Sequence, residues 1–166
     1  NDLWLSDITY IPTREGWLYL AAVLDAYSRA LVGWAMSRTL DTKLAMDALN
    51  MAIAHRGPPV TLHSDQGSTY ATGSYREIVN RYGIRQSMSR KGDCWDNAPM
   101  ESFFHTLKTE LVMHCDYKTR DDARVSLFDY MEVFHNRQRR HSSISYEAPL
   151  PFEAMKSPGK VSTVRG

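Results

Sequence analysis

The order of hydrophobic patterns along the chain constrains the fold more than any other feature of the sequence. Three runs of strand length, rich in β-branched, aromatic and aliphatic residues, come first: Trp4 to Ile11, Trp17 to Leu24 and Ala30 to Ser37. The connections between them are short and rich in turn-forming residues, as in Thr13 to Gly16. Neighbouring runs are therefore predicted to form β-hairpins, so that the chain opens with three antiparallel strands.

The hydrophobic period then changes from that of a strand to that of a helix. Apolar residues at helical spacing predict a helix from Thr42 to His55, which Gly57 and two prolines end. A strand from Val60 to His63, a helix from Ser74 to Tyr82 and a strand from Ile84 to Met88 follow. Because a strand reached through a helix lies parallel to its neighbour, the fourth and fifth strands are predicted to run parallel to one of the first three. The fourth is expected to pair with the first, because the carboxyls of Asp7 and Asp65 would then lie close enough to share one metal. This order outlines an α/β domain of the ribonuclease-H-like kind, with a mixed five-stranded sheet flanked by helices.

Two more helices are expected after the last strand. Each carries one apolar stripe, which we interpret as core. The stripes are Met100, Phe103, Phe104, Leu107 and Leu111 in one helix, and Ala123, Leu127, Tyr130, Met131 and Phe134 in the other. The catalytic core is expected to cover residues 1–141, and residues 142–166, rich in proline, are expected to form an irregular C-terminal arm.

Composition limits the class of protein. The chain has 166 residues, of which 43% are hydrophobic and 23% charged, as in an ordinary soluble globular domain. Two cysteines give no disulfide framework, and no apolar run reaches the roughly 18–20 residues of a membrane span. The formal net charge of +1 gives no information about a partner. Because the first residue is Asn1, we expect the chain to be a piece of something longer.

Three acidic residues are candidates for chemistry. Asp7 lies inside the first predicted strand, where a half-buried carboxylate costs several kcal/mol of solvation unless it is compensated. Asp65 ends the fourth strand, and open α/β sheets form their ligand crevices at the carboxyl ends of parallel strands. Glu101 lies in the first turn of the next helix, at the edge of its apolar face, with His105 and Lys108 along the same edge.

Each of these acids also has a purely structural interpretation. Asp7 could pair with a local arginine or cap a bulge, and Asp65 could hold a glycine-containing turn. The negative charge of Glu101 could simply be stabilised by the dipole at the start of its helix. Together, however, three carboxylates converging on one crevice would repel one another and bind a hard divalent cation. Two Mg²⁺ ions held in this way could activate a hydroxyl and stabilise the leaving oxygen in phosphodiester chemistry.

The local sequence around these acids resembles a known family. Thirty-five residues separate Asp65 from Glu101, which is the spacing of retroviral integrases and insertion-sequence transposases. The matching strings, in chain order, are Asp7 to Tyr10, Leu24 to Arg29, His63 to Gly67, Gly92 to Phe104, His135 to Ser143 and Tyr146 to Pro149. From about Trp4 to Phe152, the chain resembles the integrase-core domain of an OrfB-type bacterial insertion-sequence transposase.

The resemblance implies a metal, a reaction and a partner. The family's catalytic and metal-binding acids fall on Asp7, Asp65 and Glu101, which would hold two Mg²⁺ or Mn²⁺ ions in the active complex. The family's reaction is hydrolytic release of a 3′-hydroxyl at the end of the element, followed by attack of that hydroxyl on another phosphodiester. The implied partner is double-stranded DNA, both element ends and target, bound by a homo-oligomer that assembles on it. The implied location is the bacterial cytoplasm, with the nucleoid and away from membranes.

Basic residues near this site are candidates for contacts with DNA phosphates. Retroviral integrases carry basic residues one and two turns after the catalytic glutamate, positions that fall on His105 and Lys108. Two basic runs, 76–91 and His135 to His141, also favour contacts with the DNA backbone. They include Arg90, Lys91, Arg137, Arg139 and Arg140. No helix-turn-helix pattern is present, so recognition of the element ends is expected to lie upstream.

Other polar residues are interpreted as structural. Asp25 matches a family string but precedes a hairpin turn, where aspartate is common. His63 is interpreted as a satisfied core histidine. Cys94 and Cys115 are too few and too poorly spaced for a zinc site.

Two other functions stay open beside that of a transposase catalytic domain. One is a ribonuclease-H-like nuclease that hydrolyses DNA without strand transfer, which the flanking strings disfavour. The other is a catalytically inactive, transposase-derived module for DNA binding or assembly, which the presence of all three acids disfavours.

Overall fold

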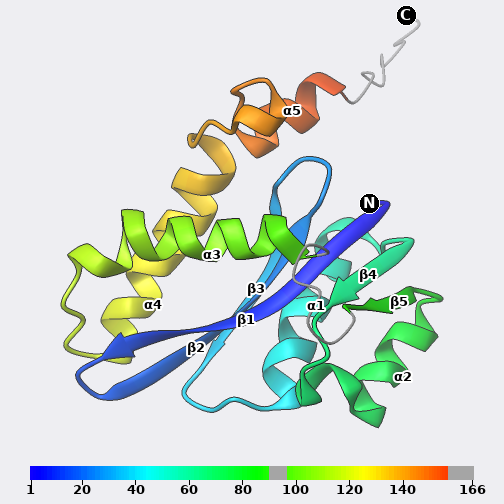
Figure 1. Ribbon diagram of the computed structural model, residues 1–166, viewed down its shortest axis with the longest axis horizontal. Helices are drawn as coiled ribbons and strands as arrows, with labels where there is room; N and C mark the ends of the chain where they lie inside the picture. Colours follow the sequence, from blue (N-terminus) through cyan, green and yellow to red (C-terminus); the bar gives the residue numbers. More distant parts are fainter. Residues whose placement is uncertain (90–96, 157–166) are drawn as a thin grey trace, which may run out of the picture.

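The computed structural model describes residues 1–89 and 97–156, which contain a five-stranded sheet in the order β3-β2-β1-β4-β5 (Figure 1). Its first part is an antiparallel meander of β1 (Leu3–Thr13), β2 (Gly16–Asp25) and β3 (Leu31–Ser37). Short turns join these strands, so the three predicted antiparallel strands are confirmed.

The second part of the sheet is parallel. β4 (Thr61–Ser64) pairs with β1, and β5 (Arg85–Met88) pairs with β4. A helix precedes each of these strands, as the crossover rule requires. The predicted pairing of the fourth strand with the first is therefore confirmed.

Helices cover both faces of the sheet (Figure 1). One core lies between the sheet and α1 (Thr42–Arg56) with α2 (Gly73–Arg81). The other lies between the sheet and α3 (Ala98–Glu110) with α4 (Arg120–Phe128). Short 3-10 turns at Ser68–Ala71 and Val112–His114 join these elements. No helix in the described ranges combines the length and the apolar character needed to cross a membrane.

The second of the two late helices departs from expectation. Its α-helical part, α4, is followed by a π-helical segment, η4 (Asp129–His135). The i→i+5 bonding of a π-helix changes the phase at which side chains leave the helix. Consequently Phe134, predicted to be core, is 39% exposed, whereas His135 and Asn136 are buried.

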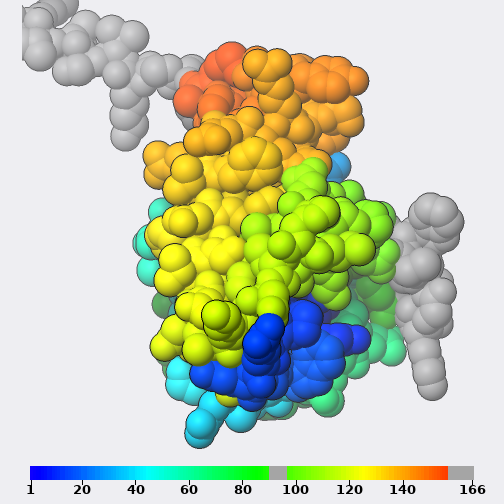
Figure 2. All heavy atoms as spheres, turned by 90° about the vertical axis from the view of Figure 1, so that its left-hand side faces the viewer, coloured from blue at the N-terminus to red at the C-terminus, as the bar shows by residue number. Residues whose placement is uncertain are grey.

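The chain after residue 141 is more regular than expected. It forms a 3-10 turn, η5 (Ser142–Ile144), and a helix, α5 (Pro149–Lys156). Ile144 and Phe152 are buried, and Glu153 accepts hydrogen bonds from Ser28 and Arg56. Figure 2 shows this orange segment stacked on the end of the yellow α4–η4 element. The expectation of an irregular arm is therefore wrong for 149–156, because apolar and ionic contacts anchor that helix to the domain.

Candidate active site

Asp7 lies in the middle of β1, on the face of the sheet covered by α3. Side chains alternate between the two faces of a strand. Leu5 and Ile11, which have the same parity as Asp7, pack against residues of α3 and α4. The Asp7 side chain is half-buried, and its Oδ1 accepts a hydrogen bond from the backbone N–H of Ile8 at 2.8 Å. A carboxylate in this partly dry position opposes folding, which suggests a use other than packing.

Asp65 lies beside Asp7, just beyond the carboxyl end of β4. The parallel register places Ser6 of β1 opposite Ser64 of β4. Asp7 and Asp65 are the next residues of the two strands, so they are neighbours as well. The Oδ1 atom of Asp65 accepts a hydrogen bond from the N–H of Gly67 at 2.8 Å. Asp65 therefore does hold a glycine-containing turn, and this turn fixes its carboxylate at the carboxyl end of β4, beside Asp7.

Glu101 lies in the first turn of α3, the helix that crosses over β1 (Figure 1). Pro99 occupies the start of this helix, where its missing N–H leaves no hydrogen bond unmade. Met100 and Phe103 are buried, while Glu101 is exposed. The sequence places Glu101 at the edge of the buried face, and in the structure this side chain is exposed next to the buried Met100.

The three carboxylates influence one another electrostatically. The pKa of Asp7 is raised to about 6, first by burial and then by the negative charges of Asp65 and Glu101. The Ile8 N–H and the Lys108 ammonium act in the opposite direction. A strand, a strand end and a helix thus bring three acids within range of each other, and a divalent cation among them would offset both the repulsion and the desolvation.

The carboxylates do not yet enclose a metal-sized space. Within residues 1–89 and 97–156, no three His, Cys, Asp or Glu side chains lie close enough together to hold an ion. Asp7 and Asp65 each accept a backbone N–H, and like charges keep apart when no cation separates them. The donor set itself fits a hard divalent cation, because carboxylate oxygens are the ligands that Mg²⁺ prefers.

The two basic residues expected on α3 differ in position. Lys108 lies near enough to Asp7 to lower the pKa of that carboxyl, and its Nζ lies 5.1 Å from the centre of the Tyr10 ring. Its ammonium is therefore held at the site by a cation–π contact. His105 is exposed one turn earlier on α3.

The other expected DNA contacts divide into three groups. Arg137 and Arg140 are exposed at the end of η4. Arg139 instead forms a two-pronged ion pair with Glu110, with Nη2–Oε1 at 2.8 Å and Nε–Oε2 at 3.0 Å. A phosphate contact by Arg139 stays a prediction, and it requires this pair to open. Arg90 and Lys91 lie outside the described residues.

The residues interpreted as structural have satisfied polar groups. The Oδ1 atom of Asp25 accepts the backbone N–H groups of Tyr27 and Ser28, which closes the β2–β3 turn. The two ring nitrogens of His63 lie 2.9 Å from the hydroxyls of Ser87 and Ser89. The structural interpretation of Asp25 and His63 is confirmed. Cys115 is a free, exposed thiol, and Cys94 lies outside the described residues.

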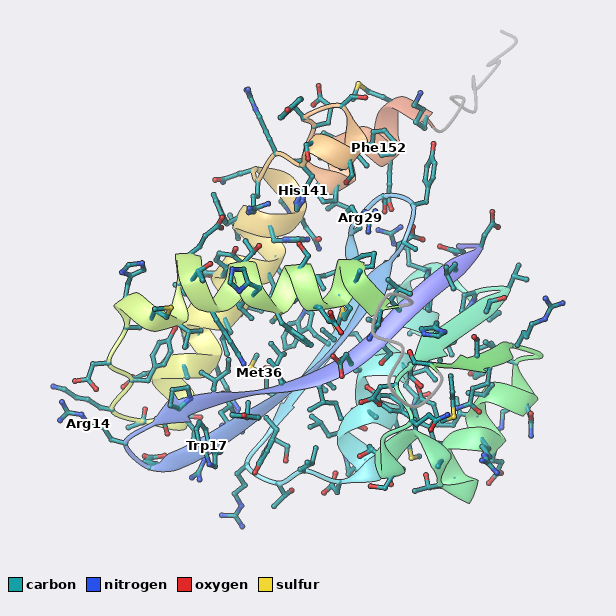
Figure 3. All side chains as sticks on the ribbon, viewed as in Figure 1. Arg14, Trp17, Arg29, Met36, His141 and Phe152 are labelled. Carbon is teal, nitrogen blue, oxygen red and sulfur yellow. The ribbon has the colours of Figure 1, made fainter. Side chains whose placement is uncertain are left out.

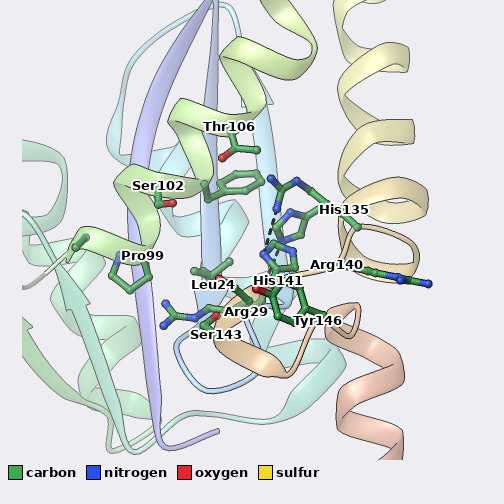
Figure 4. A pocket seen from close by; sticks show the side chains of 14 residues that line it. Leu24, Arg29, Pro99, Ser102, Thr106, His135, Arg140, His141, Ser143 and Tyr146 are labelled. Atoms are coloured by element: carbon green, nitrogen blue, oxygen red, sulfur yellow. Dashed lines mark hydrogen bonds between the residues drawn. The ribbon is translucent and has the colours of Figure 1, made fainter.

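Sequence reasoning missed a basic cavity beside α3, shown in Figure 4. Arg29, in the β2–β3 turn, is its most informative residue, and in the sequence it stands out only as the last residue of the string Leu24 to Arg29. The available signal was an arginine at the end of a tight hairpin turn, where Gly, Asn or Asp is usual. That signal gives no direction in space, so the cavity could not be found from it.

Comparison with known proteins establishes the family. Two family models, both described as integrase core domain, match residues 1–94 and 101–156. The chain belongs to the integrase core domain family.

The relatives include transposases of bacterial insertion sequences. The chain is 44% identical over 159 residues to the transposase for insertion sequence element IS904 of Lactococcus lactis. It is 46% identical over 155 residues to the transposase InsF for insertion sequence IS3A of Escherichia coli. These matches cover 95% and 92% of this chain but 63% and 54% of the relatives. The chain therefore spans little more than half the length of the relatives it matches.

Solved structures with the same fold include retroviral ones. A simian T-cell lymphotropic virus intasome matches with a TM-score of 0.76 at 18% identity, over 100% of this chain and 58% of that one. The HTLV-2 integrase catalytic core domain in complex with magnesium matches with a TM-score of 0.70 at 17% identity, over 92% and 95% of the two chains. At such identities the likeness concerns the fold alone, and it confirms the predicted ribonuclease-H-like architecture.

Proposed function

We propose that this chain is the catalytic domain of a DNA transposase, which releases a 3′-hydroxyl at the ends of its element and joins it to another DNA phosphodiester. The observation that carries this proposal is the position of Asp7, Asp65 and Glu101 near the carboxyl end of β4, where burial first, and then the charges of Asp65 and Glu101, raise the pKa of Asp7. The names of the insertion-sequence relatives support the same reaction.

Asp7, Asp65 and Glu101 are the residues that would hold Mg²⁺ or Mn²⁺, two ions in the active complex. When bound, such ions activate an attacking hydroxyl and stabilise the leaving oxygen. Asp7 and Asp65 are fixed by paired strands and backbone hydrogen bonds, so they set the position of the site. Glu101 is exposed on α3 and closes the site by turning its side chain toward the two aspartates.

The substrate proposed is double-stranded DNA, bound by a homo-oligomer. Lys108 places a positive charge beside the carboxylates, where a phosphate oxygen approaching the site would be attracted. Arg137 and Arg140 add exposed positive charge after η4, suited to phosphates farther along the duplex. The fixed charges of the domain thus attract the DNA backbone around a negatively charged centre.

A strand-transfer assay on the intact protein tests this proposal. With Mn²⁺ and a labelled element end, the wild type should give both a nicked end and a joined product. The Asp65→Asn variant should give neither while still binding DNA. Nicking without joining would indicate a ribonuclease-H-like nuclease, and binding without either product would indicate an inactive assembly module.

A further inference from the structure

A cavity of about 640 Å³ lies between α3, the β2–β3 turn and the segment 135–146 (Figure 4). Its charged lining is entirely basic among the described residues: three arginines and two histidines, accompanied by four serine or threonine hydroxyls. Ala98, Pro99 and Ser102 form one wall, and they belong to the same turns of α3 that carry Glu101. The cavity is therefore a neighbour of the candidate active site and is large enough for a nucleotide-sized ligand.

Arg29 is the side chain in this cavity that most needs an anion. It is half-buried, and burial lowers the pKa of its guanidinium. Within residues 1–89 and 97–156, no carboxylate forms an ion pair with it. Figure 4 shows the guanidinium pointing toward Pro99, at the end of α3 where Glu101 lies. A partly dry guanidinium is stabilised when an anion such as a phosphate comes beside it.

The backbone is strained at the same place. Arg29, Ser145 and Tyr146 have φ values of 64°, 60° and 59°, and they are the non-glycine residues of the described chain with positive φ. Arg29 and Tyr146 line the cavity, and Ser145 adjoins Tyr146. Such conformations persist only where surrounding contacts impose them, and they cluster at ligand sites. Two separate turns are thus held in an unfavourable form to bring Arg29 and Tyr146 to one cavity.

Two histidines that line the cavity, the buried His135 and the half-buried His141, have incompletely satisfied polar atoms. His135 Nε2 lies 2.9 Å from the carbonyl oxygen of Arg29, so it carries the proton and Nδ1 is an acceptor. His141 Nδ1 accepts from Arg139 at 3.3 Å, so its Nε2 carries the proton. His135 Nδ1 and His141 Nε2 are buried without a hydrogen-bond partner among the described residues. Buried polar atoms in this condition usually mark a place where a ligand or water completes the site.

We propose that this cavity holds one nucleotide of the DNA strand that runs to the active site, next to the reacting phosphodiester. The phosphate lies at Arg29 with the hydroxyls of Ser102 and Ser143, and the base lies against the exposed ring of Tyr146. Guanidinium and hydroxyl donors suit a phosphate, and an exposed tyrosine ring suits base stacking. The inference rests on the proposed function, because it assumes that a DNA strand is bound at the active site that contains Glu101.

Matched arginine variants test the phosphate contact in the intact protein. Arg29→Gln is compared with Arg14→Gln, which removes the same charge from the other hairpin turn, at the opposite end of the sheet (Figure 3). Binding of a fluorescein-labelled duplex of the element end is measured by anisotropy in EDTA over a range of NaCl. Arg29→Gln should weaken binding about tenfold and lower the salt slope by about one. Arg14→Gln should match the wild type.

The lysine variant separates the charge from the geometry, and it guards against misfolding. Arg29→Lys should keep the salt slope of the wild type but lose part of the affinity, because an ammonium cannot bind a phosphate with two parallel hydrogen bonds. All variants should melt within a few degrees of the wild type in EDTA. Equal DNA affinity for Arg29→Gln and Arg14→Gln would overturn the proposal.

Photocrosslinking locates the nucleotide along the strand. With 5-iododeoxyuridine placed at successive positions of the duplex, Tyr146 should crosslink only at positions adjoining the cleaved bond. Crosslinks confined to distant positions would overturn the proposal. Complete loss of the Tyr146 crosslink when free dTMP is added as a competitor would also overturn it, because the cavity would then bind a free nucleotide and not the strand. Both measurements are made without cleavage, so loss of metal-dependent cleavage in the wild type would refute the proposed function separately.

Discussion

At the scale of single residues, Asp7 is the side chain whose surroundings conflict most with its charge. Its neighbours along β1 belong to the cores on both faces, and the negative charges of Asp65 and Glu101 act on its carboxylate. A strand residue chosen for stability would be apolar or β-branched. The raised pKa of Asp7 is therefore a cost in stability at a position that we propose to be catalytic.

This cost predicts a pH-dependent effect of Asp7→Asn. The pKa of Asp7 is about 6 in the folded protein, against 3.8 as the ordinary value. Between these values the folded state binds more protons than the unfolded state, so stability falls as pH rises from about 4 to 6. Asp7→Asn should be more stable than the wild type by about 3 kcal/mol at pH 7 and nearly equal to it near pH 4. Urea unfolding in EDTA at four pH values measures this.

Glu110→Gln provides a control with the opposite sign. The Arg139 guanidinium lowers the pKa of Glu110 below its ordinary value, so its contribution is present above that value and is lost as pH falls through the lowered pKa. Glu110→Gln should therefore destabilise the protein at neutral pH. If Asp7→Asn destabilised the protein at pH 7 as well, Asp7 would be a structural ion-pair residue.

At the scale of elements, the packing of α1 on β3 depends on one glycine. A Cβ added at Gly33 would lie 2.3 Å from the carbonyl oxygen of Ala48 and 2.7 Å from the Cβ of Ala52. Both obstacles belong to helix α1, whose small residues bring its backbone against the sheet. Close approach of helix and strand, and not a special φ value, is the reason for glycine at this position.

Gly33→Ala should therefore destabilise the domain by about 3 kcal/mol, because the helix must move away from the sheet. Gly73→Ala is the matched control, since a Cβ there meets nothing within 4 Å and the residue begins α2. That control should be neutral or slightly stabilising. Urea unfolding of the two variants measures the difference, and similar midpoints would contradict the packing argument.

At the scale of the whole molecule, the acidic centre and the basic surroundings predict opposite responses to ions. The carboxylates repel one another in the absence of a cation, which opposes folding. On the proposed function, the arginines and Lys108 attract DNA phosphates, and salt would weaken that attraction. The effect of a bound metal should therefore be measured as a change in protein stability, and the effect of salt as a change in DNA affinity.

Binding of Mn²⁺ to the folded site should stabilise the protein by about 1.4 kcal/mol at ten times Kd. For a domain of this size, the melting temperature should rise by roughly 3–6 °C. Asp65→Asn should lose most of this rise and should be as stable as the wild type, or slightly more stable, in EDTA. Thermal melts at constant ionic strength measure both effects. An equal rise in both proteins, or a much weaker variant in EDTA, would make Asp65 a turn residue only.

The exposed arginines should contribute to DNA affinity without regard to sequence. Arg137→Gln and Arg140→Gln should each lower the salt slope of DNA binding by about one, equally for element-end and unrelated duplexes. Arg139→Gln should act less on DNA and more on stability, because its guanidinium is paired with Glu110. Arg124→Gln, which removes an arginine paired with Asp121 on α4, is the control. Loss of affinity for one duplex only would contradict a backbone contact.

The sequence by itself determined the order of the elements and the parallel direction of β4 and β5. Both follow from local periodicity, loop length and the crossover rule, which neighbouring residues encode. The pairing of β1 with β4 was expected for another reason, that Asp7 and Asp65 would share a cation, and the strand register agrees with that pairing. The position of Glu101 at the edge of its apolar face follows from helical spacing. Family strings then added the chemistry that the acids alone left open.

Only the tertiary structure decided the π-helical turn that buries His135, the ion pair of Arg139 with Glu110, the packing of α5 and the cavity at Arg29. Each of these depends on contacts between residues far apart in the chain, as when His135 bonds the carbonyl of Arg29. Such contacts leave no periodic trace in the sequence, because they arise from the shapes and polar atoms that folding brings together. The side chains of Arg29 and Tyr146 meet at one cavity for that reason.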